Sequence, residues 1–167
     1  MTPTALVRGV YSNTNNGSIL LQKGFDTMER LINPASRKGP AESFTGEVWF
    51  DQIYRGEEPS RARVNAVHFT PCARTAWHTH AVGQTLHVTE GIGLVATRDG
   101  KVIVMRPGDT VHTPPGEWHW HGATSENFMT HLAIWEGAGD PNVPETTWGE
   151  QVTDDEYRRA DHQRDRS

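Results

Sequence analysis

The chain has 167 residues, of which 35% are hydrophobic, and its formal net charge is −5 at pH 7. This length suffices to bury the core of one domain without disulfides, and a mildly acidic chain is a poor nucleic-acid binder. No apolar run approaches the ~20 residues of a membrane span, so we expect neither a nucleic-acid nor a membrane partner. One cysteine, Cys72, excludes an internal disulfide, and the chain starts without a signal-peptide pattern, so we expect a cytoplasmic protein.

The first 43 residues are rich in Asn, Ser, Thr, Gly and Pro and hold only short apolar pieces, such as "SILLQ" and "MERLI". This composition predicts a partly ordered N-terminal arm over residues 1–43, which we expect to pack on a neighbouring chain.

Residues 44–136 consist of short β-prone runs, including "FTGEVWFDQIY", "ARVNAVHFT", "QTLHVTEGIGLVAT", "KVIVMRPGDTVHT" and "FMTHLAIWEG". Turn signals such as "RGEEPS", "RPGD" and "PPGE" separate the runs, and "TRDGKV" is typical of a tight hairpin. Helical periodicity is absent from this stretch. The pattern therefore predicts an all-β domain, an antiparallel barrel or sandwich.

Residues 137–167 begin with loop residues. The stretch "VTDDEYRR" predicts a short helix capped by Thr153 or Asp154, followed by a frayed charged tail.

Two His-x-His pairs stand out, His78 with His80 and His119 with His121. Residues two apart on a strand share a face, so each pair points one way. The bend "AVG" lets Gln84 return toward the same centre, on a face that continues with apolar residues. Buried unpaired polar groups cost ~1–3 kcal/mol each, and a divalent cation would satisfy them. A hydrogen-bonded polar cluster in a barrel mouth is the alternative that spacing leaves open.

The chain resembles the cupin superfamily in two motifs. The first places His78-x-His80, three residues, Gln84, six residues and a glycine in order, with Cys72 where a glycine is expected and Gln84 where glutamate is usual. The second runs from Gly108 through "PPG" to His119, with alanine in place of the final asparagine. The resemblance implies a β-barrel or jelly roll with a metal site, occupying residues 44–136.

A narrower resemblance covers residues 44–158. The stretches "FTGEVWFD", "ARTAWHTH", "GQTL", "PGEWHWHGA" and "MTHLAI" are similar to small bacterial cupins that include manganese-dependent hydroxynitrile lyases. The resemblance implies a set of metal ligands, which are His78, His80, Gln84 and His119. It implies polar pocket residues, His121 and His131, and apolar pocket residues, Val67, Phe69 and Leu86. Asn65 and Trp135 occupy pocket positions where members of that family often carry other side chains.

Three imidazoles and one amide are neutral ligands, so a divalent ion bound to them would keep its +2 formal charge. The usual glutamate would reduce that charge to +1, so Gln84 favours a stronger Lewis acid and disfavours oxygen chemistry. Nitrogen and oxygen donors suit manganese, iron, nickel or zinc, and the resemblance favours one manganese ion per chain.

His131 shares its strand face with two neighbours in "MTHLAI", so it becomes a candidate general base if that face is the inner one. An imidazole satisfied by a backbone carbonyl is the alternative. His121 is a second candidate base. His68 and His87 fall on the opposite face by alternation and are predicted to be structural or solvated.

The sequence therefore leads to three functional hypotheses. The first is a metal-dependent lyase that cleaves or forms cyanohydrins of small aromatic aldehydes. The second is a metal-dependent dioxygenase or decarboxylase of small organic acids, and the third is a non-catalytic cupin that binds a small ligand. Unpaired sheet edges and the apolar surface of the tryptophan-rich strands favour association with another chain, so we expect a homodimer or homotetramer.

Overall fold

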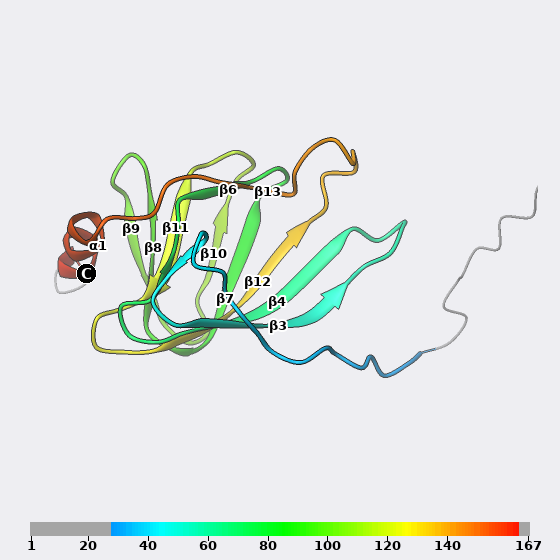
Figure 1. Ribbon diagram of the computed structural model, residues 1–167, viewed down its shortest axis with the longest axis horizontal. Coiled ribbons are helices and arrows are strands. Elements are labelled where there is room, and N and C mark those ends of the chain that lie inside the picture. Colours follow the sequence, from blue (N-terminus) through cyan, green and yellow to red (C-terminus); the bar gives the residue numbers. More distant parts are fainter. Residues whose placement is uncertain (1–27, 164–167) are drawn as a thin grey trace, which may run out of the picture. The chain divides into compact units, whose positions relative to one another are not determined.

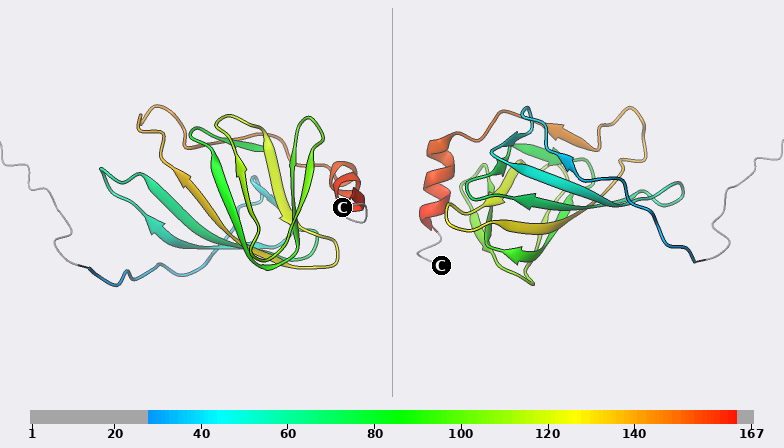
Figure 2. Two further views of the ribbon diagram at one scale, coloured as in Figure 1. Left: turned by 180° about the vertical axis from the view of Figure 1, so that it is seen from behind. Right: turned by 60° about the horizontal axis from the view of Figure 1, so that its bottom comes forward.

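The computed structural model describes residues 28–163, and its strands and helix all lie in one compact unit that begins at Ile32. Two antiparallel sheets curve around a common interior in that unit (Figure 1). Seen from behind and from below, the two sheets enclose the interior like a barrel that opens at one end (Figure 2). Among the described residues, no helix is long and apolar enough to cross a membrane.

The first sheet has six strands. In spatial order they are β1 (Arg37–Lys38), β3 (Val48–Arg55), β4 (Ala62–Phe69), β12 (Met129–Glu136), β7 (Gln84–Gly91) and β10 (Thr110–Thr113). β12 is central, because it pairs antiparallel with β4 on one side and with β7 on the other.

The second sheet is built around β11. Its main path runs through β13 (Thr146–Trp148), β6 (His78–His80), β11 (His119–Ala123), β5 (Arg74–Thr75) and β2 (Phe44–Thr45). On the other side of β11 lies β8 (Gly93–Thr97), which pairs in turn with β9 (Val102–Met105).

Two apolar clusters hold these layers together. The first fills the interior between the sheets and includes Val48, Phe69, Leu86 and Met129, each 2% exposed or less. The second lies outside the barrel, where Trp120 and its neighbours pack against the helix α1 (Asp154–Asp161). Burial of side chains of this size stabilises a fold by roughly 1.5–3 kcal/mol each before entropy is counted.

Local predictions about the turns and the helix are confirmed. Thr153 caps α1, and its hydroxyl and the Glu156 side chain form a capping box. The stretch "TRDGKV" forms the hairpin between β8 and β9, where Gly100 has φ 87°. Cys72, at the position where the cupin motif has glycine, has φ 68°, a left-handed conformation that glycine adopts at lower cost.

The all-β, antiparallel barrel that the sequence predicts is confirmed, with a short C-terminal helix. The division into an arm (1–43), a barrel (44–136) and a C-terminal part (137–167) stays a prediction, and residues 1–27 lie outside the described part. Strand pairing crosses both proposed boundaries, because β1 pairs with β3 and β13 pairs with β6.

Two glycines with positive φ give a matched test of close packing. A Cβ at Gly91 (φ 73°) would overlap the backbone carbonyl of Phe128, whereas a Cβ at Gly100 (φ 87°) would meet nothing within 4 Å. Both alanine variants carry the same kind of backbone strain, so their difference isolates the clash. We expect Gly91→Ala to lower the free energy of unfolding by about 1–3 kcal/mol more than Gly100→Ala. Urea denaturation measures both, and equal losses would contradict the packing described.

Candidate metal centre and pocket

Strand register brings three histidines to one place on the inner side of the second sheet. His78 on β6 and His119 on β11 are directly paired, and His80 lies two residues further along the same face. All three side chains are at most 4% exposed. Their ligand nitrogens lie within 4.8 Å of one another, which is close enough for a single ion to contact all three.

The outer nitrogen of each ring is already engaged. His78 Nδ1 lies 3.0 Å from the carbonyl oxygen of Ala76, and His119 Nδ1 lies 2.9 Å from that of Glu117. A carbonyl only accepts, so both Nδ1 atoms donate and both Nε2 atoms carry a lone pair. His80 Nδ1 contacts the hydroxyl of Thr146 at 3.2 Å, which helps to hold the ring in its orientation.

Gln84 completes the group from the first sheet. Its Oε1 lies 3.0 Å from His119 Nε2, and its side chain is 4% exposed. With His119 donating through Nδ1, these two buried atoms are both acceptors that face each other, an arrangement that a cation or another donor between them would satisfy. The donor set thus fits a divalent transition ion, and His78, His80, His119 and Gln84 would hold it.

Burial keeps these imidazoles neutral. Desolvation, reinforced by the neighbouring His119, lowers the pKa of His78 well below its ordinary value and lowers the pKa of His80 to about 4. Desolvation also lowers the pKa of His119. Near pH 7 all three imidazoles are therefore neutral, which is the form that binds a metal.

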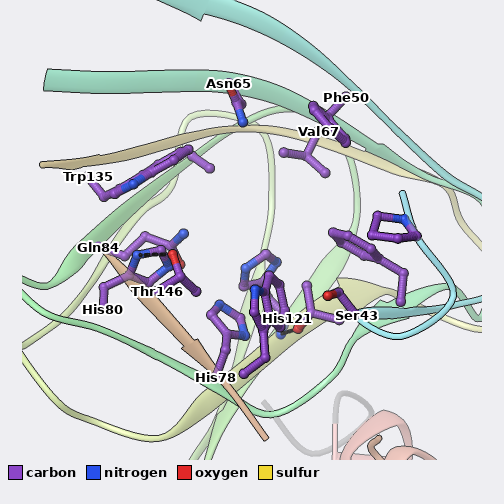
Figure 3. A pocket seen from close by; sticks show the side chains of 15 residues that line it. Ser43, Phe50, Asn65, Val67, His78, His80, Gln84, His121, Trp135 and Thr146 are labelled. Carbon is purple, nitrogen blue, oxygen red and sulfur yellow. Dashed lines mark hydrogen bonds between the residues drawn. The ribbon is translucent and has the colours of Figure 1, made fainter. Parts of the chain in front are cut away.

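A cavity of about 250 Å³ opens beside the histidines, between the two sheets. In Figure 3, Phe50, Asn65, Val67 and Trp135 lie on one side of it, and the histidines lie opposite. The complete lining is Pro40, Ser43, Phe44, Phe50, Asn65, Val67, Thr75, His78, His80, Gln84, His121, Ala133, Trp135, Thr146 and Trp148. The surface of the cavity is mostly apolar, with the histidines and Gln84 on one side and Asn65 on the other, as in sites that bind small molecules.

Of the five residues predicted for the substrate pocket, the structure brings three to the cavity wall, namely Asn65, Val67 and Trp135. Phe69 and Leu86 do not line the cavity and lie in the interior cluster, to which Val67 also belongs. Phe69 packs beside His121, with the two ring centroids 5.7 Å apart. A role in substrate binding stays a prediction for all five residues.

Sequence reasoning missed several wall residues. Phe50 could have been found from the sequence, because it alternates with Val48 along β3 and so shares the face of that buried residue. No sequence pattern pointed to Phe44 or Trp148. Each lies on a short strand, β2 or β13, whose pairing partner is distant in the sequence. Their placement depends on long-range pairing alone.

His121 and His131 lie one behind the other. His121 lines the cavity, whereas His131 is fully buried and contacts it from behind, with His131 Nε2 lying 3.1 Å from His121 Nδ1. Desolvation lowers the pKa of His121 well below its ordinary value and that of His131 to about 4. One ring must donate and the other accept, so the pair forms a hydrogen-bonded chain that ends at the cavity.

His68 and His87, which were predicted to be structural or solvated, do not line the cavity. His68 contacts Asp51 and Thr130, both at 3.1 Å, and His87 contacts Thr110 at 2.8 Å. Trp77 and Trp120 pack in the second apolar cluster, outside the barrel.

The comparisons with known proteins agree with this geometry. The model of the cupin domain family matches residues 65–135. A crystal structure of a cupin-like protein from Thermotoga maritima is 36% identical, with a TM-score of 0.68, over 74% of this chain and 91% of that one. The polyketide cyclase RemF from Streptomyces resistomycificus, at 19% identity and a TM-score of 0.58 over 79% and 92% of the two chains, shares the fold.

An antiparallel barrel with three clustered histidines and these matches defines the class, and the chain belongs to the cupin superfamily. Within it, the chain is 47% identical to the (R)-mandelonitrile lyase of Granulicella tundricola, over 79% of this chain and 98% of that protein. A relative that is a lyase supports an enzymatic role for the chain.

The ligand assignment can be tested with two histidines on different faces of the barrel. We expect purified parent protein to carry close to one divalent ion per chain, and His80→Ala to lower that content sharply because one buried donor is lost. His87→Ala, on the outer face, is the control and should keep the parental content. Metal analysis by mass spectrometry measures both. Full metal content in His80→Ala would show that the ligand assignment is wrong.

Proposed function

We propose that the protein is a metal-dependent lyase that cleaves or forms cyanohydrins of small aromatic aldehydes. The observation that carries the proposal is the neutral ligand group at the floor of an apolar cavity with aromatic walls. The 47% identity to a mandelonitrile lyase supports the same reaction class.

Manganese is the ion we propose, one per chain, with iron, zinc and nickel as alternatives of similar ligand chemistry. A bound divalent ion would supply Lewis acidity toward the hydroxyl oxygen of the cyanohydrin. His78, His80, His119 and Gln84 leave its positive charge undiminished because none of them is anionic. That charge would attract the alkoxide oxygen that develops during cleavage.

We propose that His121 moves the proton. It is the histidine outside the ligand group that reaches the cavity wall, and it is neutral near pH 7. In cleavage it takes the hydroxyl proton, the bond between carbon and cyanide breaks with its electrons going to cyanide, and the carbonyl forms. The proton is then returned to cyanide, which leaves as hydrogen cyanide.

His131 supports this step from behind. The contact between His131 Nε2 and His121 Nδ1 holds the His121 ring in one orientation. It also lets His131 stabilise the positive charge on His121 when that ring accepts a proton. Removal of His131 should therefore lower the rate with metal retained, by ~10²–10⁴, the range typical of lost proton-transfer catalysis.

The neutrality of Gln84 is the feature most open to experiment. Gln84→Glu keeps an oxygen donor but lowers the formal charge at the site from +2 to +1, so an alkoxide or departing cyanide loses attraction. Removal of single electrostatic stabilisers typically costs ~10²–10³ in rate, and we expect a loss of at least about tenfold in mandelonitrile cleavage. Metal content should stay at the parental level or rise, and steady-state kinetics with metal analysis measures both.

Asn142→Asp is a matched control for this variant. It makes the same amide-to-carboxylate change on an exposed loop, where the Asn142 side-chain amide donates to Asp140, so the rate should not change. If Gln84→Glu keeps its metal and cleaves mandelonitrile at the parental rate, the electrostatic argument fails. Oxygen uptake by an iron-loaded sample, without cyanohydrin cleavage, would favour the dioxygenase hypothesis instead.

We also propose that the protein acts in the cytoplasm as a homodimer or homotetramer. The outer face of the first sheet supports self-association, because Trp49, Ile53 and Ile134 are 44%, 39% and 37% exposed there. Light scattering at micromolar concentration should give a mass of two or four chains. A monomer at that concentration would contradict the proposal.

A further inference from the structure

One ion pair beside the cavity is built more tightly than a surface contact. Arg63 on β4 has a side chain that is 12% exposed, and its Nε and Nη2 donate to the carboxylate of Glu145 at 2.9–3.2 Å. Its remaining nitrogen, Nη1, donates to the carbonyl oxygens of Gly56 and Ala62, both at 3.1 Å. Every donor-bearing nitrogen of the guanidinium is therefore engaged, which fixes the position of the carboxylate.

The carboxylate in turn holds an aromatic wall of the cavity. The indole nitrogen of Trp135 donates to Glu145 Oε2 at 3.2 Å. Partial burial alone would raise the pKa of Glu145, but hydrogen bonds from Arg63 and Trp135 outweigh it and hold the pKa below its ordinary value. Glu145 therefore stays an anionic acceptor across the neutral pH range.

Trp135 stands directly beside the proposed metal ligands. It is the strand partner of Gln84, and its ring centroid lies 5.7 Å from that of His80. Figure 3 shows its ring bordering the cavity above Gln84. The orientation of this indole therefore sets the shape of the cavity where a substrate would meet the ligand group.

We propose that Glu145, held by Arg63, is a positioning residue that fixes the Trp135 indole as a flat wall of the cavity and gives the pocket a preference for aryl over branched aliphatic substrates. The inference rests on the proposed function, because only that function makes the bound molecules substrates. The binding preference itself can be measured without catalysis. A fixed flat wall offers contact to a planar ring, whereas a wall free to rotate loses that contact and admits bulkier groups.

The test measures binding of two unreactive alcohols to the metal-loaded full chain by calorimetry. Benzyl alcohol is the aryl probe and neopentyl alcohol is the branched one. The parent should bind benzyl alcohol more tightly. Glu145→Ala should weaken benzyl alcohol binding by roughly threefold to tenfold, the effect of one lost hydrogen bond, and leave neopentyl alcohol binding equal or tighter. Glu145→Gln keeps an acceptor oxygen for the indole and should restore part of the loss.

Two further variants test the contact itself. Trp135→Phe keeps a ring but lacks the N–H donor, so it removes the same hydrogen bond as Glu145→Ala. The double variant should therefore lose no more affinity for benzyl alcohol than the weaker-binding single variant. Glu136→Ala removes the neighbouring exposed carboxylate, whose oxygen lies 3.9 Å from Arg61, and should leave both affinities unchanged. If Glu145→Ala leaves Arg63 unpaired and fails to fold, Glu145→Gln and Trp135→Phe carry the comparison.

Kinetics separates this inference from the proposed function. With mandelonitrile, the Glu145 variants should raise KM with kcat nearly unchanged and metal content equal to the parent. Unchanged benzyl alcohol affinity in Glu145→Ala, additive losses in the double variant, or an equal loss for both alcohols would overturn the positioning role. A parent that cleaves no cyanohydrin, but whose Glu145 variants still weaken benzyl alcohol alone, would overturn the proposed function and support the positioning role.

Discussion

The pairing of β6 with β11 is the constraint on which the site depends. It places His78 directly opposite His119, and the carbonyls of Ala76 and Glu117 take the outer hydrogen of each ring. Two lone pairs then face a buried space into which Gln84, from the opposite sheet, adds another acceptor. Buried acceptors without donors are costly, so the fold is consistent at this point only when a cation or an equivalent donor joins them.

The segment that ends in β13 closes the site from the other side. Thr146 contacts His80, and the Trp148 ring centroid lies 4.8 Å from that of His78. Glu145, one residue earlier, holds Trp135, and its backbone carbonyl accepts the N–H of Ala81. One short stretch thus orients a ligand and the aromatic walls together, because consecutive residues on an extended chain reach opposite sides of it.

Burial has opposite consequences for the two groups of histidines. It keeps the ligand histidines neutral, which favours metal binding. It also makes His121 a weak base, because the same desolvation opposes its protonation. In the proposed mechanism, a negative charge that develops in the cavity would offset that penalty and favour proton transfer to His121 while substrate is bound. In that mechanism, the contact with His131 would give the transferred proton a second nitrogen to interact with.

The sequence by itself determined the all-β class, the hairpin at Gly100, the cap at Thr153 and the shared face of His78 and His80, because each follows from local geometry within a few residues. The resemblance to cupins implied the remaining candidate ligands. Only the tertiary structure decided that Phe69 and Leu86 lie in the interior cluster, and that His131 stands behind His121. It alone brought Trp148 and Glu145 to the cavity. These placements depend on the register between strands distant in the chain, and a register is set by the packing of whole faces rather than by any local signal.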